Sequence, residues 1–164
     1  MDALTAIAAR RSVRKFNSKP VPKDILEKIV DAGRLAPTAR NEQPWEFIVV
    51  TDRDMLKKIG EITDNGKFII DAGACIAVIC AATKYYLEDG CAATENILIA
   101  ATALGIQSCW VAGDKKLYCQ SILALLGVPP QYNLVSLLAL GYADGEAKTY
   151  IKRALDRVLH WEKF

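Results

Sequence analysis

A dense group of cations near the start of the chain is the first feature that could do chemistry. Residues 10–16 read Arg-Arg-Ser-Val-Arg-Lys-Phe, which places four cations and a hydroxyl within six residues. Guanidinium groups donate paired hydrogen bonds to phosphate oxygens, so this cluster can hold a phosphate group. A second interpretation stays open, in which Arg10 and Arg11 only complement the negative end of a first helix.

A second segment, residues 36–45, reads Ala-Pro-Thr-Ala-Arg-Asn-Glu-Gln-Pro-Trp. With this segment the chain resembles the FMN-dependent nitroreductase family, whose Arg-Arg-Ser-x-Arg-x-Phe motif is followed by Ala-Pro-Thr-Ala-x-Asn-x-Gln-Pro-Trp. Further matches occur in the family's order at residues 95–101, 103–110 and 140–142. Any one of these short motifs is weak evidence, whereas the ordered set covers nearly the whole chain and is specific.

The resemblance implies FMN as the cofactor and NADH or NADPH as the electron donor. Arg10, Arg11 and Ser12 match the family positions that grip the FMN phosphate and the adjoining ribityl chain. Arg14 matches the position that reaches the pyrimidine end of the flavin ring. A cation suits that place, because reduction puts negative charge on this end of the ring.

The other implied cofactor contacts come from separate segments. In the family, the segment that matches residues 110–113 lies along one flavin face and directs a backbone N–H at N5, the atom that receives hydride. No catalytic side chain is therefore expected. The implied contacts are Pro37, Thr38, Ala39 and Asn41, which pack against a flavin held mainly by the other subunit; Asn65 at the pyrimidine edge; Trp110, Val111, Ala112 and Gly113; and Lys152 and Arg153, which complete the phosphate site.

Several of these residues also have a purely structural interpretation. Lys152 and Arg153 belong to a charged stretch that can simply be a solvated face. Cys109 lies beside the proposed flavin segment, but nothing near it in the sequence would lower the pKa of its thiol, so we assign it no catalytic role. Tyr85 and Tyr86 are left open between a pocket rim, the surface and a dimer contact.

Composition narrows the class of protein. The chain has 164 residues, of which 52% are hydrophobic, and 21 basic against 19 acidic residues give a net charge of +2. The absence of a long basic run argues against a nucleic-acid partner. Five cysteines without a CxxC pair argue against disulfides and zinc, and no apolar run approaches the roughly 18 residues that span a bilayer. We expect a single cytoplasmic domain over residues 1–164, with no metal and no membrane partner.

Hydrophobic periodicity and turn residues predict alternating helices and strands. That alternation alone favours a doubly wound parallel sheet, yet the glycine-rich phosphate loops of such folds are missing, so the pattern leaves the topology open. Gly105 occupies the position that a left-handed helix cap requires. The expected helices are residues 3–11, 23–35, 54–62, 91–104 and 117–126, and the expected strands are residues 45–51, 74–82, 108–112 and 134–140.

For the fold, the resemblance implies an α+β nitroreductase-like domain with a central mixed, largely antiparallel sheet flanked by helices. It also implies an intertwined homodimer with FMN at the interface, in which a terminal strand at residues 158–161 joins the partner's sheet. The chain is short for the family, and only residues 63–67 and 84–89 remain to form a rim. An open site with a loose substrate preference is therefore expected.

For function, the resemblance implies an NAD(P)H-dependent FMN oxidoreductase that reduces small electrophiles such as nitroaromatics or quinones. The mechanism would be ping-pong hydride transfer through flavin N5. Alternatives are a specialised relative such as a reductive dehalogenase, a flavin-binding dimer with a storage or sensing role, and a dimeric interaction module without cofactor. The natural substrate and the choice between NADH and NADPH stay open.

Overall fold

The computed structural model describes residues 1–164 and contains one four-stranded sheet with the strand order β1-β2-β4-β3. Every neighbouring pair of strands is antiparallel, so the expected mixed sheet is not found within one chain. The alternation of helices and strands does not produce a parallel sheet, because β4 lies between β2 and β3 and separates the two strands that the longest helix connects. The strands are β1 (Trp45–Val50), β2 (Ala74–Ala81), β3 (Gln107–Ala112) and β4 (Tyr132–Gly141).

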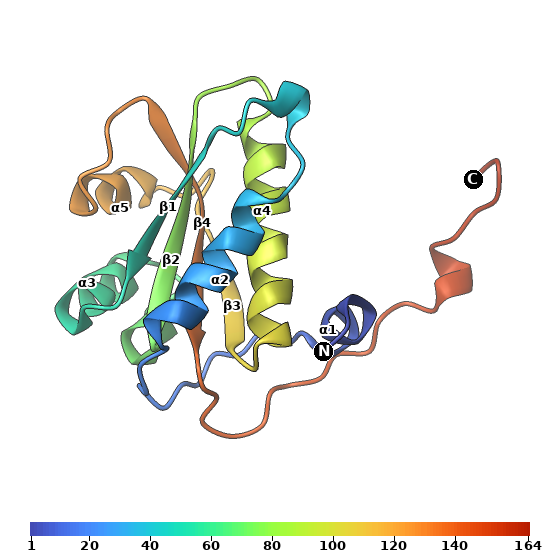
Figure 1. Ribbon diagram of the computed structural model, residues 1–164, viewed down its shortest axis with the longest axis horizontal. Coiled ribbons are helices and arrows are strands. Elements are labelled where there is room, and N and C mark those ends of the chain that lie inside the picture. The colour runs from blue at the N-terminus through green and yellow to red at the C-terminus, as the bar shows by residue number, and fades with distance from the viewer.

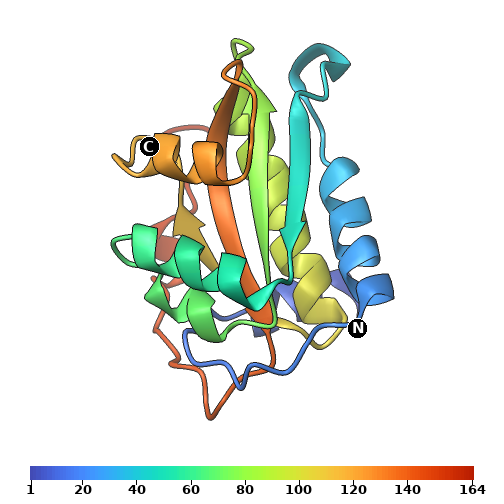
Figure 2. The ribbon, with the colours of Figure 1, turned by 90° about the vertical axis from the view of Figure 1, so that its left-hand side faces the viewer.

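Helices cover both faces of this sheet (Figures 1 and 2). Helices α2 and α4 lie side by side on one face, whereas α3, α5 and a short 3-10 turn, η2, lie on the other. Helix α1 packs near the C-terminal end of α4, and no helix is long and apolar enough to cross a membrane. The helices are α1 (Ala3–Ala9), α2 (Lys23–Arg34), α3 (Arg53–Ile62), α4 (Tyr86–Ala103) and α5 (Cys119–Leu125), and the 3-10 turns are η1 (Ala39–Asn41), η2 (Lys67–Asp71) and η3 (Leu155–Arg157).

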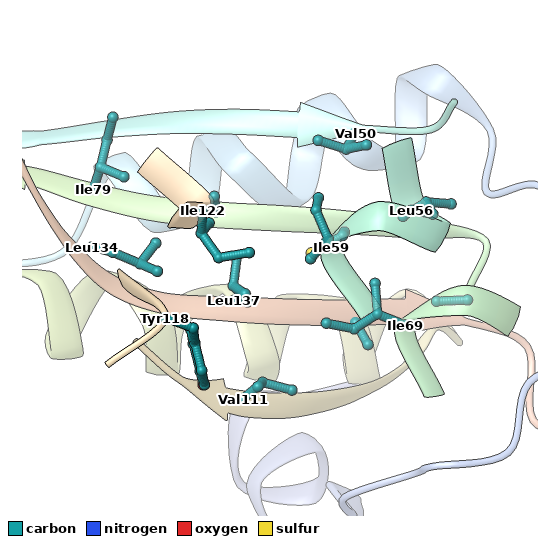
Figure 3. Packing of buried hydrophobic residues seen from close by; sticks show 14 of the residues in the cluster. Val50, Leu56, Ile59, Ile69, Ile79, Val111, Tyr118, Ile122, Leu134 and Leu137 are labelled. Atoms are coloured by element: carbon teal, nitrogen blue, oxygen red, sulfur yellow. The ribbon is translucent and has the colours of Figure 1, made fainter. Parts of the chain in front are cut away.

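Two hydrophobic cores, one on each face of the sheet, hold the layers together. Successive residues of β2 alternate between them: Ile76 packs with α2 and α4, and Ala77 packs with α3 and α5. Figure 3 shows the second core, where Ile59 of α3 and Ile122 of α5 meet Leu137 of β4. Because both faces of β2 and β4 are buried, these strands consist mainly of apolar residues rather than an alternating pattern.

The largest error in the expected elements concerns α4, which begins at Tyr86 rather than at residue 91. Gly90 favours a later start on propensity alone, because glycine is a poor helix former. Packing decides otherwise, since a Cβ atom at this position would lie 2.6 Å from Cγ2 of Val135. Gly105 has a φ of +78° directly after the helix, as predicted for its left-handed cap.

After β4 the chain leaves the sheet and runs past α1 (Figure 1). Residues 158–161 form no strand in the single chain, so the exchanged strand stays a prediction. Large apolar side chains of this tail face solvent, as do Leu4 and Ile7 of α1. Contiguous exposed apolar surface commonly marks an interface with another chain. The exposed apolar residues of the tail are Tyr150, Ile151, Leu155, Val158, Leu159, Trp161 and Phe164.

Candidate functional site

The structure brings the basic N-terminal segment and the basic tail together around one cavity of about 360 Å³. Residues 10–12 follow the end of α1 and are anchored beside β3, where Val13 N–H donates to the Ser108 carbonyl at 2.9 Å. The tail contributes Lys148, Tyr150 and Lys152 to the lining of the same cavity. No acidic side chain lines the cavity, so its charge is strongly positive. Its lining consists of Ile7, Ala8, Arg10, Arg11, Ser12, Lys148, Tyr150 and Lys152.

The two adjacent arginines are partly engaged within the protein. Arg11 Nη1 donates to the carbonyls of Ala8 at 2.6 Å and Arg10 at 2.8 Å, so Arg11 does complement the end of α1. Arg10 Nε lies 3.9 Å from a carboxylate oxygen of Glu95, which is a loose ion pair. Each guanidinium carries five N–H donors. Both arginines therefore keep donors for an anion, and the two interpretations of this cluster are compatible.

Arg14 lies between the anion-binding cavity described above and a cavity next to β3. It lines a second cavity of about 410 Å³, which shares Ser12 and Lys148 with the first, and also a third of about 160 Å³. Its guanidinium carbon lies 6.0 Å from the ring centroid of Phe68. Through these shared residues the three cavities form one run, which begins at the end of α1 and reaches β3 at the third cavity. Asp144 and Glu146 also line the second cavity. The third is lined by Arg14, Asn65, Phe68, Trp110, Val111, Ala112, Lys116 and Tyr118.

The backbone of β3 directs an N–H group into the third cavity. Gly113 N–H is used within the sheet, where it donates to the Val135 carbonyl at 3.2 Å. Along an antiparallel pair of strands, opposing residues that hydrogen-bond to each other alternate with opposing residues that do not. Ala112 N–H therefore points away from β4, on the same side as the Ser108 carbonyl that Val13 contacts. The Ala112 carbonyl accepts a hydrogen bond from the Tyr118 hydroxyl, which fixes the end of the strand.

Gly113 is required at this place by close packing. A Cβ atom there would lie 2.8 Å from Leu134 Cγ and 2.9 Å from the carbonyl carbon and oxygen of Val135. Two of these three contacts are backbone atoms, which have little freedom to move. The glycine thus keeps the end of β3 against β4, next to the free N–H of Ala112.

The proline-containing loop lies at the opposite end of the molecule from α1 (Figure 1). It contacts the N-terminal end of α4, where Ala39 N–H donates to Asp89 Oδ1 at 3.0 Å. One chain therefore does not bring this loop to the three cavities. The predicted contacts concerned are Pro37, Thr38, Ala39 and Asn41, and none of them lines those cavities.

The two basic tail residues behave differently. Lys152 lines the first cavity, whereas Arg153 turns its guanidinium to the carbonyl of Arg157 and lines none of the three. Sequence reasoning also missed residues that line the run. Lys148 and Tyr150 lie at the start of the same basic stretch as Lys152, and that stretch is the sequence signal for them. Phe68, Lys116 and Tyr118 carry no distinguishing sequence signal.

Two groups near the site, the Cys109 thiol and the Tyr86 hydroxyl, have raised pKa values. Burial raises the pKa of the Cys109 thiol, and the nearby Arg14 opposes this only in part, so the thiol is protonated and inert at neutral pH. The Tyr86 hydroxyl donates to Asp114 Oδ1 at 2.8 Å, and this hydrogen bond raises the pKa of Tyr86 to about 12. Tyr85 is not tied in this way, and Lys84 Nζ lies 5.1 Å from its ring centroid.

Known proteins resemble this chain in sequence and in fold. The chain matches the model described as the nitroreductase family over residues 7–74 and 67–142. A protein of Archaeoglobus fulgidus, provisionally named NADH dehydrogenase/NAD(P)H nitroreductase, is 41% identical over 157 residues, which cover 91% of this chain and 90% of the relative. An FMN-dependent nitroreductase of Clostridium difficile has a TM-score of 0.91 at 31% identity, covering 98% of this chain and 99% of the other. A nitroreductase of Bacteroides fragilis with bound FMN has a TM-score of 0.83 at 27% identity, with 99% and 100% covered.

These matches confirm the nitroreductase-like α+β fold, with its antiparallel four-stranded sheet between helices. The family model spans most of the chain, and the relative from Archaeoglobus fulgidus passes 40% identity over nearly the full length of both proteins. The chain belongs to the nitroreductase family.

Proposed function

We propose that this protein is an FMN-dependent oxidoreductase that uses NADH or NADPH to reduce small electrophiles such as nitroaromatics or quinones. The observation that carries the proposal is the run of cavities from the end of α1 to β3. It has an anion-binding cluster at one end, and a cation and a free backbone N–H at the other. The similar structures from Clostridium difficile and Bacteroides fragilis, described as FMN-dependent and as FMN-bound, support the same cofactor.

The residues present fit FMN at both ends. Arg10, Arg11, Ser12 and Lys152 would hold the phosphate, because the first cavity offers several charged donors and no carboxylate is among its lining residues. Glu95, which lies outside the lining, forms only a loose ion pair with Arg10. The third cavity offers apolar and aromatic walls, including Trp110, which suit a flat ring system. When bound, FMN supplies the two-electron redox chemistry, and the protein supplies binding, orientation and electrostatics.

At the ring end, the proposed roles fall on one backbone group and two cations. Ala112 N–H would donate a hydrogen bond to the cofactor, and Tyr118 fixes the adjoining carbonyl. Arg14 and Lys116 would place positive charge beside the ring system, which suits the negative charge that reduction adds. No side chain has to act as an acid or base in this scheme, since solvent can supply the proton.

The site is complete only in a homodimer in this proposal. Pro37, Thr38, Ala39 and Asn41 would contact the cofactor bound mainly by the partner subunit, which explains why one chain keeps them far from its own β3. The exposed apolar tail and α1 would be covered by the same partner. Burial of such surface is the main favourable term in association.

The terminal strand of the partner would join the sheet at β1 rather than at β3. The outer edge of β3 is already used by Val13 and by the cavities. By contrast, a groove of about 730 Å³ runs between β1 and α2, with Val21, Val30 and Val49 among its lining residues. Residues 158–161 of the second copy would lie there as an added strand. If that strand ran parallel to β1, the sheet of the dimer would be mixed, as the family resemblance implies.

An absorbance spectrum followed by anaerobic addition of NADH or NADPH tests the proposal. Flavin bands that bleach with nicotinamide and recover with a nitroaromatic or a quinone are expected. Because one pocket serves both reactants in turn, steady-state kinetics should be ping-pong. A colourless protein that takes up no added FMN would refute the cofactor. A yellow protein that nicotinamides do not reduce would instead favour storage or sensing.

A further inference from the structure

The tip of the proline-containing loop, residues 38–43, has an unusual backbone. Arg40 and Asn41 have φ values of +57°, and Gln43 has a φ of +47°. Residues other than glycine rarely adopt this left-handed region, and such conformations persist only when the surroundings hold them in place. The tip therefore needs a tether that its own local preferences do not supply.

Hydrogen bonds connect this tip to the rest of the chain at one point only. Gln43 N–H donates to Thr38 Oγ1 at 3.3 Å, and Gln43 Nε2 donates to Asn41 Oδ1 at 3.0 Å, but both bonds lie within the tip. The one bond that leaves it runs from Ala39 N–H to Asp89 Oδ1, at 3.0 Å. The carboxylate of Asp89 is thus the polar anchor of the strained segment.

Asp89 itself is in a costly position for a carboxylate. It lies in the first turn of α4, with only 5% of its surface exposed. Its second oxygen, Oδ2, is buried and has no hydrogen-bond partner. Buried polar atoms are normally paired, and an unpaired one destabilises the fold. A residue kept at such a cost for one hydrogen bond is expected to serve more than packing.

We infer that Asp89 is a positioning residue, which holds residues 38–43 in the one conformation that can contact the cofactor of the partner subunit. The inference rests on the proposed function, since it supposes that this loop meets FMN. Asp89 does not touch the cofactor in this scheme. It acts through the backbone of Ala39, and it determines how well the second subunit completes the site.

The test compares Asp89→Ala with the control Glu88→Ala, which changes an exposed neighbour on the same helix. Limited trypsin digestion of the cofactor-free protein reports on the tip directly, because Arg40 lies in it and is exposed. Loss of a hydrogen bond to a charged group corresponds to a change of about tenfold. In Asp89→Ala we expect cleavage after Arg40 to be about tenfold faster and the FMN Kd to be about tenfold weaker. Glu88→Ala should leave both within about twofold of wild type.

Two further variants keep the test decisive if Asp89→Ala folds poorly. Asp89→Asn retains an oxygen that can accept from Ala39, so its cleavage rate should stay near wild type. Ala39→Pro removes only the donor, and Thr38 already has the extended conformation (φ −131°, ψ 153°) that precedes proline. It should accelerate cleavage after Arg40 as Asp89→Ala does.

The outcomes separate this inference from the proposed function. Faster cleavage with an unchanged FMN Kd would overturn the inference and leave the oxidoreductase intact. Unchanged cleavage in both Asp89→Ala and Ala39→Pro would overturn the tether itself, as would Asp89→Asn behaving like Asp89→Ala. A wild-type protein that binds no FMN would refute the proposed function, and this would be seen before any variant is made.

Discussion

Replacing Gly113 with alanine should damage the site through packing alone. The added Cβ would lie 2.8 Å from Leu134 Cγ and 2.9 Å from two backbone atoms of Val135, closer than real Cβ atoms come. Because backbone atoms cannot rotate away, the ends of β3 and β4 must separate by several tenths of an ångström. Overpacking of this kind costs about 1–3 kcal/mol of unfolding free energy. It should also lengthen the 3.2 Å bond from Gly113 N–H to Val135 and displace the neighbouring N–H of Ala112.

Gly105→Ala provides a matched control for this effect. Gly105 has a φ of +78° and open space where a Cβ would be placed, so alanine there costs about 1–2 kcal/mol through backbone conformation and not through packing. Urea denaturation should show both variants destabilised. Only Gly113→Ala should also change the FMN midpoint potential and the rate of reduction by NADH. If both variants reduce stability but neither alters the bound flavin, the proposed position of the Ala112 N–H is wrong.

Three other perturbations test separate parts of the site and of the core. Arg14→Ala should make bound FMN harder to reduce by about 20 mV, because an exposed charge contributes up to about 1 kcal/mol and 30 mV corresponds to 1.4 kcal/mol in a two-electron couple; an unchanged potential by dye titration would contradict that role. Lys152→Glu should weaken FMN binding, measured by fluorescence titration, whereas Arg153→Glu should not, because only Lys152 lines the first cavity; equal losses would refute the distinction. Burial raises the pKa of Cys75 to about 12, so the protonated thiol favours the folded state, and the unfolding free energy should fall as the pH rises from 9 towards 12; Cys75→Ala should show a shallower decline.

Local sequence signals predicted most elements because each signal acts within a few residues. The turn after α4 needed a left-handed residue, and Gly105 supplies one. The start of α4 was misplaced because Gly90 is required by close packing against Val135, which is distant in sequence. The strand order was not predictable from pattern either. Strands β2 and β4 are buried on both faces, so they lack the alternation that would distinguish an antiparallel sheet from a parallel one.

The chemistry of the site was predictable where residue type alone was decisive. Arginines that are adjacent in sequence must lie close together, so the cluster around Arg10 needed no tertiary information. The meeting of this cluster with Lys148 and Lys152 depends on the path of the tail, which no local pattern specifies. Tyr118 was missed for a related reason. It is 7% exposed and resembles any core aromatic until its hydroxyl is found on the Ala112 carbonyl.

The distance between the cationic segment, residues 10–16, and the proline-containing loop has a physical meaning. The cationic segment and the proline-containing loop lie at opposite ends of α4, a rigid helix of 18 residues. A helix of that length spans about 27 Å at 1.5 Å per residue, so no local flexing brings the two motifs of one chain together. If both serve one cofactor, as we propose, they must come from different subunits. Dimerisation would then complete the active site as well as cover apolar surface, and dilution to monomers should release FMN.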